Sequence, residues 1–184
     1  MSEPARRQQR FEQVYRENRA AILGYVLRRT SNADDAADVI ADTFLTAWRR
    51  LDNLPAGEAA RPWLYGVARR ALANHHRGER RRVALGERLR SELAASAFGE
   101  FGACNVAPPA GTEVIAAAFR GLPGRDREIL SLAAWESLDA GQIAVVLGCS
   151  RNAARIRLHR ARRRLALAMR DSGVVTSDMI GHPA

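Results

Sequence analysis

Residues Ser137–Ser150 read SLDAGQIAVVLGCS and Arg151–Leu165 continue with RNAARIRLHRARRRL, and together they predict a helix-turn-helix. In the first part, apolar residues recur at the spacing of one helix face, at Ala140, Ile143, Ala144 and Leu147. Gly148 follows them, and glycine ends helices because it adopts the left-handed conformation without strain. Ser150 is then a typical N-cap for the next helix.

The second of these helices is rich in arginine. Between Ser150 and Arg170 there are eight arginines and no acidic residue, so the segment should bind phosphates in a salt-dependent way. A narrow apolar stripe faces inward, formed by Ala154, Leu158, Ala161 and Leu165. The residues expected to contact DNA are Arg151, Asn152, Arg155, Ile156, His159 and Arg163. The alternative is a solvated basic face on an ordinary helical hairpin, although such faces usually mix both signs of charge.

The composition fits a small intracellular DNA-binding protein. The 184 residues carry a net charge of +9, and all 29 basic residues are arginine. Arginine's planar fork suits phosphate and guanine, but a chain without lysine that is also rich in alanine equally indicates a GC-rich genome, and we favour the genomic explanation for the bias itself. The two cysteines, Cys104 and Cys149, are too few and too far apart for a zinc site or a disulfide framework. We expect no leader and no membrane span, and a cytoplasmic location.

The charge changes sign along the chain. Residues 30–60 hold six acids against two arginines, and residues 61–90 hold nine arginines against two glutamates. Glycine and a Pro-Pro pair between 99 and 111 indicate a linker. We therefore predict an all-α fold with two small helical domains at 6–82 and 112–170. The flexible linker is expected at 83–111, partly helical at 83–97, and a short tail at 171–184.

A helix predicted from about Asp34 to Leu51 combines a core-facing arc with an acidic stripe. The stripe and its apolar neighbours are Asp35, Asp38, Asp42, Leu45 and Trp48. Large apolar residues beside acids are unusual on a solvated face, so this surface is predicted to dock a protein. The alternative is an acidic helix start favoured by the helix dipole, with a tryptophan folded back onto the core.

A third helix is predicted to start at Arg61, with Pro62 in its first turn. One edge of this helix holds Trp63, Arg70, Asn74 and Arg77. Cations, an amide and an aromatic ring along one edge suit a nucleic-acid strand, although Trp63 equally fits a structural role at the helix entry. His75 and His76 point about 100° apart on a helix, so they do not ligate one metal ion together.

Three segments resemble the extracytoplasmic-function group of bacterial RNA polymerase sigma factors, in the sigma-70 family. The sequence DDAADVIADTFLTAWRRL (34–51) resembles the core-binding helix of region 2, and RPWLYGVARRALANHHR (61–77) resembles the promoter-reading helix after it. The longest segment, LPGRDREILSLAAWESLDAGQIAVVLGCSRNAARIRLHRARRRL (122–165), resembles region 4. Their order and spacing carry the resemblance, since a lone helix-turn-helix would be weak support.

The resemblance implies a role for each surface. The acidic stripe would dock on the clamp helices of RNA polymerase core. The loop 52–60 and the edge from Trp63 to Arg77 would capture the non-template strand of the minus-ten element, where a flipped base is held in a pocket. The arginine-rich helix would read the minus-thirty-five element as duplex, and the linker would pass toward the RNA exit path. No catalytic residue, metal or cofactor is implied, and whether an anti-sigma factor binds the chain stays open.

The sequence departs from the family pattern at three positions. Arg70 stands where relatives often have asparagine, Asn74 where many have aspartate, and Gln142 where a glutamate is usual.

Two other classes of protein fit the sequence less well. A stand-alone helix-turn-helix regulator would need a dimer interface or a sensor, but the N-terminal half offers a second basic helix. A nucleic-acid enzyme would need a cluster of carboxylates or histidines to bind a metal ion. The acidic stripe is the only candidate, and it has no adjacent histidine or other basic group.

Overall fold

The computed structural model describes residues 2–93 and 113–171, and every regular element in these two ranges is a helix. The chain divides into two compact units, Met1–Cys104 and Asn105–Ala184, and the boundary falls within the predicted linker. The predicted all-α fold with two helical domains is therefore confirmed. Residues 94–111 of the predicted linker and 172–184 of the predicted tail lie outside the described residues.

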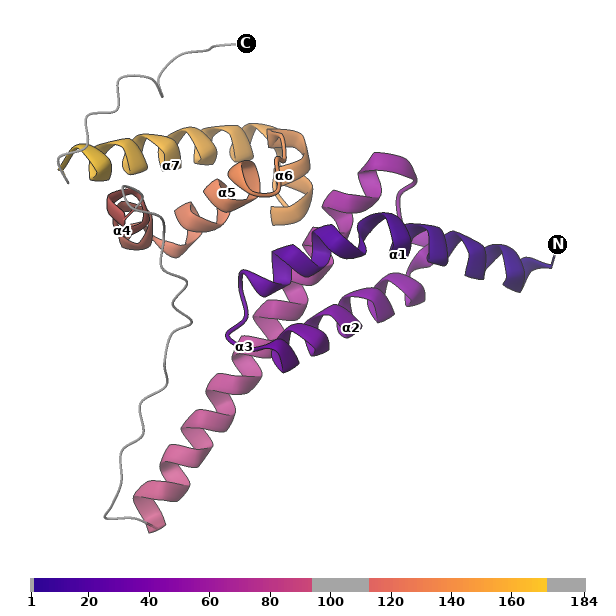
Figure 1. Cartoon of the computed structure of the whole chain (residues 1–184), viewed down its shortest axis with the longest axis horizontal. Coiled ribbons are helices and arrows are strands. Elements are labelled where there is room, and N and C mark those ends of the chain that lie inside the picture. Colours follow the sequence, from indigo (N-terminus) through magenta and orange to yellow (C-terminus); the bar gives the residue numbers. More distant parts are fainter. Residues whose placement is uncertain (1, 94–112, 172–184) are drawn as a thin grey trace. The chain divides into compact units, whose positions relative to one another are not determined.

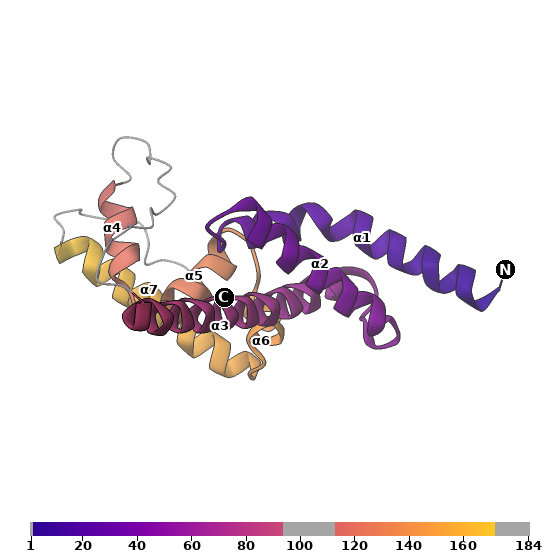
Figure 2. The ribbon, with the colours of Figure 1, turned by 90° about the horizontal axis from the view of Figure 1, so that it is seen from below.

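The first unit contains α1 (Glu3–Leu27), α2 (Ala33–Arg49) and α3 (Ala60–Leu93). Two short 3₁₀ turns, Leu51–Asn53 and Gly57–Ala59, connect α2 to α3. In Figure 1, α1 and α2 form an antiparallel hairpin, and α3 crosses it and runs on beyond its end. Figure 2 shows the same three helices from below. Each of the three packs against the other two.

Local signals in the sequence explain where α2 begins and which side it buries. The Asn32 side chain caps the helix by accepting a hydrogen bond from the Asp35 backbone N–H at 2.7 Å. Acidic side chains in the first turn, at Asp34 and Asp35, are favoured by the helix dipole. The predicted core arc is almost entirely buried, with Ala36, Val39, Thr43, Phe44, Ala47 and Leu51 buried and Ile40 half-buried.

Helix α3 is longer than its apolar pattern alone predicts. Its buried face includes the expected Leu64, Val67, Ala68 and Leu72, and also Tyr65, which packs against Tyr25 of α1 at 5.0 Å between ring centroids. The helix continues without a break to Leu93, past residue 82 where we expected the domain to end. The helical stretch expected at 83–97 is thus the end of α3 as far as it is described.

The second unit contains α4 (Glu113–Gly121), α5 (Gly124–Ala134), α6 (Ala140–Leu147) and α7 (Arg151–Asp171). In Figure 1 the other three helices line up along α7, and each packs against it. The core of this unit is formed by Ile129, Leu132, Ile143, Val146, Ala154, Leu158, Ala161 and Met169. None of the helices described in either unit is long and apolar enough to cross a membrane.

Candidate nucleic-acid interfaces

The helix-turn-helix of α6 and α7 is fixed by caps at three points. Asp139 Oδ1 accepts hydrogen bonds from the backbone N–H groups of Gly141 (2.6 Å) and Gln142 (2.9 Å). Gly148 ends α6 in the left-handed conformation, with φ of 64°. Ser150 Oγ then accepts a hydrogen bond from the Ala153 N–H at 3.2 Å and begins α7. The predicted C-cap and N-cap of the turn are both confirmed.

Gln142 performs the capping that a glutamate would perform at this position. Its side-chain oxygen accepts a hydrogen bond from the Asp139 N–H at 3.0 Å, which completes a capping box. The backbone N–H of Gln142 is the main cause that lowers the pKa of Asp139 below its ordinary value, and the N–H of Gly141 and the charge of Arg151 add to it. The departure from the family pattern therefore preserves the start of α6.

The six residues expected to contact DNA from α7 all lie exposed. Five of them, all except Arg151, lie on the helix surface opposite the buried Ala154, Leu158 and Ala161, so packing of the inner stripe decides which residues face outward. Arg155, Ile156 and His159 help to line a hollow of about 390 Å³ on this surface. The Arg151 side chain lies across the first turn of α6, beside Gly141. A side chain at position 141 would contact it, since a Cβ atom there would lie 3.7 Å from Arg151 Nε.

One of the eight arginines counted on α7 has a structural partner. Arg164 Nη1 lies 2.6 Å from Asp126 Oδ2, and the Asp126 side chain is only 11% exposed. Asp126 stands in the first turn of α5, so this ion pair ties α5 to α7. A carboxylate buried to this degree needs a partner, so Arg164 has a structural role that the sequence did not predict.

The predicted edge of α3 is present on the surface of the first unit. Arg70, Asn74 and Arg77 are exposed, and Trp63 is half-buried. The Arg77 guanidinium donates a hydrogen bond to Asn74 Oδ1, so the amide and the cation are already oriented together. Because Trp63 is half-buried, it is compatible with both predicted roles, packing at the start of the helix and contact with a nucleic-acid strand.

The acidic surface of α2 is divided by the structure. Asp38 and Asp42 are exposed, and Leu45 beside them is 44% exposed. Asp35 is different, because its carboxylate accepts a hydrogen bond from Asn32 Nδ2 at 2.9 Å and lies 3.2 Å from His75 Nε2. The sequence grouped Asp35 with the outer acids, whereas the fold directs it to the contact between α2 and α3.

Trp48 combines the two roles that the sequence left open. Its ring meets Phe11 of α1 edge to face, with centroids 5.2 Å apart, and yet 36% of the residue is exposed. It therefore packs on α1 and still contributes apolar area to the outer face of α2.

The two histidines of α3 point in different directions. Their ring centroids lie 6.1 Å apart at a steep angle, and the His75 side chain is 14% exposed and points to Asp35. In the part of the chain that the structure describes, no group of three or more histidine, cysteine or acidic side chains is placed to hold a metal ion.

An apolar groove in the second unit was not predicted. It has a volume of about 610 Å³ between α4, α5 and α7, and its wall includes Ile115, Phe119, Leu130, Trp135, Leu165 and Met169. Arg120 and Arg162 also line it. Phe119 and Trp135 meet edge to face at 5.4 Å, and Trp135 is largely exposed. The sequence signal was the i, i+4 pair Ile115 and Phe119, which alone does not tell a groove from a buried core.

Comparison with known proteins gives matches over both units. Residues 14–82 match the family described as Sigma-70 region 2, and residues 112–165 match the family described as Sigma-70, region 4. The ECF RNA polymerase sigma factor SigL of Mycobacterium tuberculosis is 30% identical over 164 residues, which cover 88% of this chain and 89% of that protein.

Two solved structures share the fold. The sigma factor RpoE, in complex with the anti-sigma factor NepR from Bartonella quintana, has a TM-score of 0.60 at 23% identity and covers 87% of this chain and 96% of that one. CnrH, in complex with the cytosolic domain of CnrY, has a TM-score of 0.57 at 22% identity, with 89% and 90% covered.

Proposed function

The chain belongs to the extracytoplasmic-function group of RNA polymerase sigma factors, and from this premise we propose how its surfaces divide the work of promoter recognition. Residues 6–82 act as region 2 and residues 112–170 as region 4. The first binds polymerase core and the minus-ten element, and the second binds the minus-thirty-five element. The protein is a transcription initiation factor by family and works in the cytoplasm with the polymerase.

The observation that best supports this proposal is the outer face of α7. Six exposed residues on and beside this face combine three arginines with an amide, a histidine and an isoleucine, next to the buried Ala154, Leu158 and Ala161. The N-terminal residues of a recognition helix contact base edges, and arginines farther along contact phosphates. We assign base contacts to Arg151, Asn152 and Arg155, and phosphate contact to Arg163. Ile156 and His159 line the hollow on this surface together with Arg155.

For the minus-ten element, we assign the exposed edge of α3 and the loop before it. Arg70 and Arg77 are placed to meet phosphates of a single strand, while Trp63 and Asn74 are placed to meet bases. Opening of the duplex needs no covalent chemistry in this scheme. It requires only that the protein bind the single strand more tightly than the duplex.

For polymerase core, we assign the outer surface of α2. Asp38, Asp42, Leu45 and Trp48 lie on it, and the mix of acids with exposed apolar side chains fits a protein partner with basic residues. Asp35 belongs to this surface through its position in the chain, but its contact with His75 gives it a supporting role.

An anti-sigma factor is the second partner that we propose. RpoE and CnrH share the fold, and RpoE was solved in complex with the anti-sigma factor NepR and CnrH in complex with the cytosolic domain of CnrY. In this chain the apolar groove of the second unit, with Arg120 and Arg162 in its wall, suits an amphipathic helix with acidic flanks.

The experiment that tests the proposal compares binding of the chain to polymerase core with its binding to promoter duplex alone. A sigma factor should bind core with high affinity and gain sequence-specific DNA binding only in that complex. A stand-alone helix-turn-helix regulator should bind a specific duplex without polymerase, and that result would overturn the proposal.

A further inference from the structure

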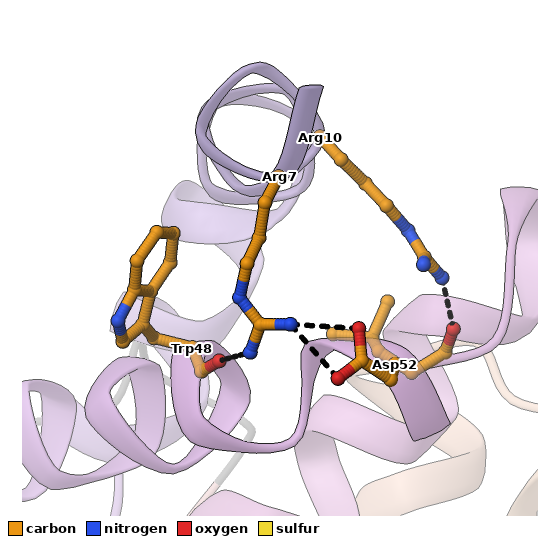
Figure 3. A network of polar contacts seen from close by, with 5 residues as sticks. Arg7, Arg10, Trp48 and Asp52 are labelled. Atoms are coloured by element: carbon orange, nitrogen blue, oxygen red, sulfur yellow. Dashed lines mark hydrogen bonds and ion pairs between the residues drawn. The ribbon is translucent and has the colours of Figure 1, made fainter. Parts of the chain in front are cut away.

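Two arginines in the first half of α1 hold the turn that connects α2 to α3 (Figure 3). Arg7 Nη1 donates hydrogen bonds to both carboxylate oxygens of Asp52, at 2.7 and 2.8 Å. Arg10 Nη2 donates a hydrogen bond to the Leu54 carbonyl oxygen at 2.6 Å. These contacts span more than forty residues of sequence, from α1 to a turn that has few backbone hydrogen bonds of its own.

Arg7 also reaches the last turn of α2. Its Nη2 donates to the Trp48 carbonyl oxygen at 3.1 Å, and its guanidinium carbon lies 5.5 Å from the centre of the Trp48 ring. Carbonyl groups at a helix C-terminus lack partners within the helix, and a cation there is favourable. One side chain therefore connects the end of α2 to the turn that follows it.

The turn is held on both sides. Leu51 and Leu54 are buried beneath it, whereas Asp52 projects outward and its residue is exposed. The hydrogen bond from Arg7 is the main cause that lowers the pKa of Asp52. A single exposed ion pair contributes little to stability. The contribution is larger when one guanidinium contacts several acceptors in a network, as Arg7 does here. We refer to Arg7 and Arg10, with Asp52 and Leu54, as the α1 brace.

The α1 brace starts outside the part of the chain that matches the region 2 family. That match begins at residue 14, and both arginines precede it. Beyond the turn, the chain passes through Gly57–Ala59 directly into α3. The arginines thus act on one end of the loop 52–60, which we assign to the minus-ten element and which the family resemblance implies captures a flipped base.

We propose that Arg7 and Arg10 are positioning residues for minus-ten recognition. They order the loop before DNA arrives, so that less conformational entropy is lost when the base is captured. This inference rests on the proposed function of the loop. Neither arginine needs to touch the captured base, and the benefit is restricted to the step in which the base is captured.

The test uses holoenzyme made from the full chain and polymerase core. A promoter is first selected from a random-sequence duplex library with the unmodified protein. The probes are its non-template minus-ten oligonucleotide and the same oligonucleotide with one abasic site, placed at the base whose removal weakens binding most. For Arg10→Ala we expect binding to the intact oligonucleotide to weaken about fivefold, with unchanged binding to the abasic one.

Two further variants separate positioning from charge and from folding. Arg7→Lys keeps the positive charge but lacks the second nitrogen that lets Arg7 contact Asp52 and the Trp48 carbonyl oxygen together, so it should also lose affinity for the intact oligonucleotide only. Arg16→Ala removes an exposed arginine elsewhere on α1 and should match the unmodified protein on both probes. Thermal unfolding of each chain verifies that the variants are folded at the temperature of the assay.

Equal losses of affinity for the intact and abasic probes would overturn the inference. They would mean that the arginines act through non-specific electrostatic attraction to DNA or through folding of the chain. An absence of loss on both probes would overturn it as well. If the unmodified holoenzyme binds every abasic probe as well as the intact one, the proposed capture of a base fails, and that failure is visible without any variant.

Discussion

His75 Nε2 of α3 lies 3.2 Å from Asp35 Oδ1 of α2, and this contact separates Asp35 from the other acids of its helix. Asp35 also forms hydrogen bonds with the helix cap Asn32, through its backbone N–H and its carboxylate. Asp38 and Asp42 remain exposed. The Asp35–His75 contact therefore connects α2, whose outer surface is proposed to bind polymerase, to α3, which is proposed to bind DNA.

Charge reversal on the outer surface should weaken polymerase binding without unfolding the chain. We expect Asp38→Arg to lower the affinity for core about tenfold because it introduces repulsion with a basic partner. Leu45→Ala should also lower affinity, through loss of exposed apolar area. Titration of labelled core with each variant measures the effect, and Glu12→Arg on exposed α1 is the matched control. Unchanged affinity in both variants would remove this surface from polymerase binding.

Asp35 should behave differently from Asp38. Asp35→Ala and His75→Ala each remove one partner of the same contact, so each should lower the free energy of unfolding of the first unit by about 1 kcal/mol. Thermal unfolding and hydrogen exchange of the α2 amides measure this loss. Asp38→Ala should leave both measurements unchanged, and an equal loss in Asp38→Ala would contradict the division of the acidic surface.

On α7 we predict that two arginines have separable effects. Arg155→Ala should reduce discrimination between the correct and a mutated minus-thirty-five element by about 1–3 kcal/mol, because it removes a base contact. Arg163→Ala should weaken binding to both sequences alike and reduce the salt dependence by about one ion. Holoenzyme binding to matched duplexes over a range of salt concentrations measures both. Equal losses on specific and scrambled duplex for Arg155→Ala would refute its assignment.

The cap of α6 predicts a pH dependence. Because the folded state lowers the pKa of Asp139 from its ordinary value of 3.8, the ionised side chain stabilises the fold at neutral pH. This contribution is lost as the pH falls below that ordinary value and through the folded pKa. Asp139→Ala should cost about 1 kcal/mol at pH 7 and less in acid. Gln142→Glu should preserve the capping box at pH 7, and exchange rates of the α6 amides report both variants.

The ion pair between Arg164 and Asp126 should stabilise the second unit more than it contributes to DNA binding. Arg164→Ala leaves a largely buried carboxylate without its partner, and we expect a loss of about 1–2 kcal/mol in unfolding free energy. Hydrogen exchange of the α5 and α7 amides over a range of denaturant concentrations measures it. Asp126→Asn in the same background should recover part of the loss. Stability equal to the unmodified protein in Arg164→Ala would show that the pair is of no energetic consequence.

The features that the sequence predicted well are those set by near neighbours in the chain. The left-handed Gly148 and the N-cap Ser150 are recognisable because their partners lie within four residues. The inner stripe of α7 follows from helical periodicity alone. The same local rules placed Asn152 and Arg155 on the outer face, where the structure has them exposed.

The contacts that the sequence did not predict join residues far apart in the chain. Asp35 meets His75, Arg7 meets Asp52 and Arg164 meets Asp126 only because helices cross at particular points. Many arginines were available for each acid, so composition did not select the pair. The apolar groove between α4, α5 and α7 arises for the same reason, because the Phe119 and Trp135 rings come into contact only when these helices pack together.

Promoter-specific initiation tests the proposed function most directly. Purified chain is mixed with polymerase core that lacks any specificity subunit, and transcripts are mapped on the promoter selected from the random library, with permanganate to detect unpaired thymines. We predict one discrete start site and an opened minus-ten region only when both components are present. Transcripts and strand opening no different from those of core alone would contradict the assignment of this chain as a working sigma factor.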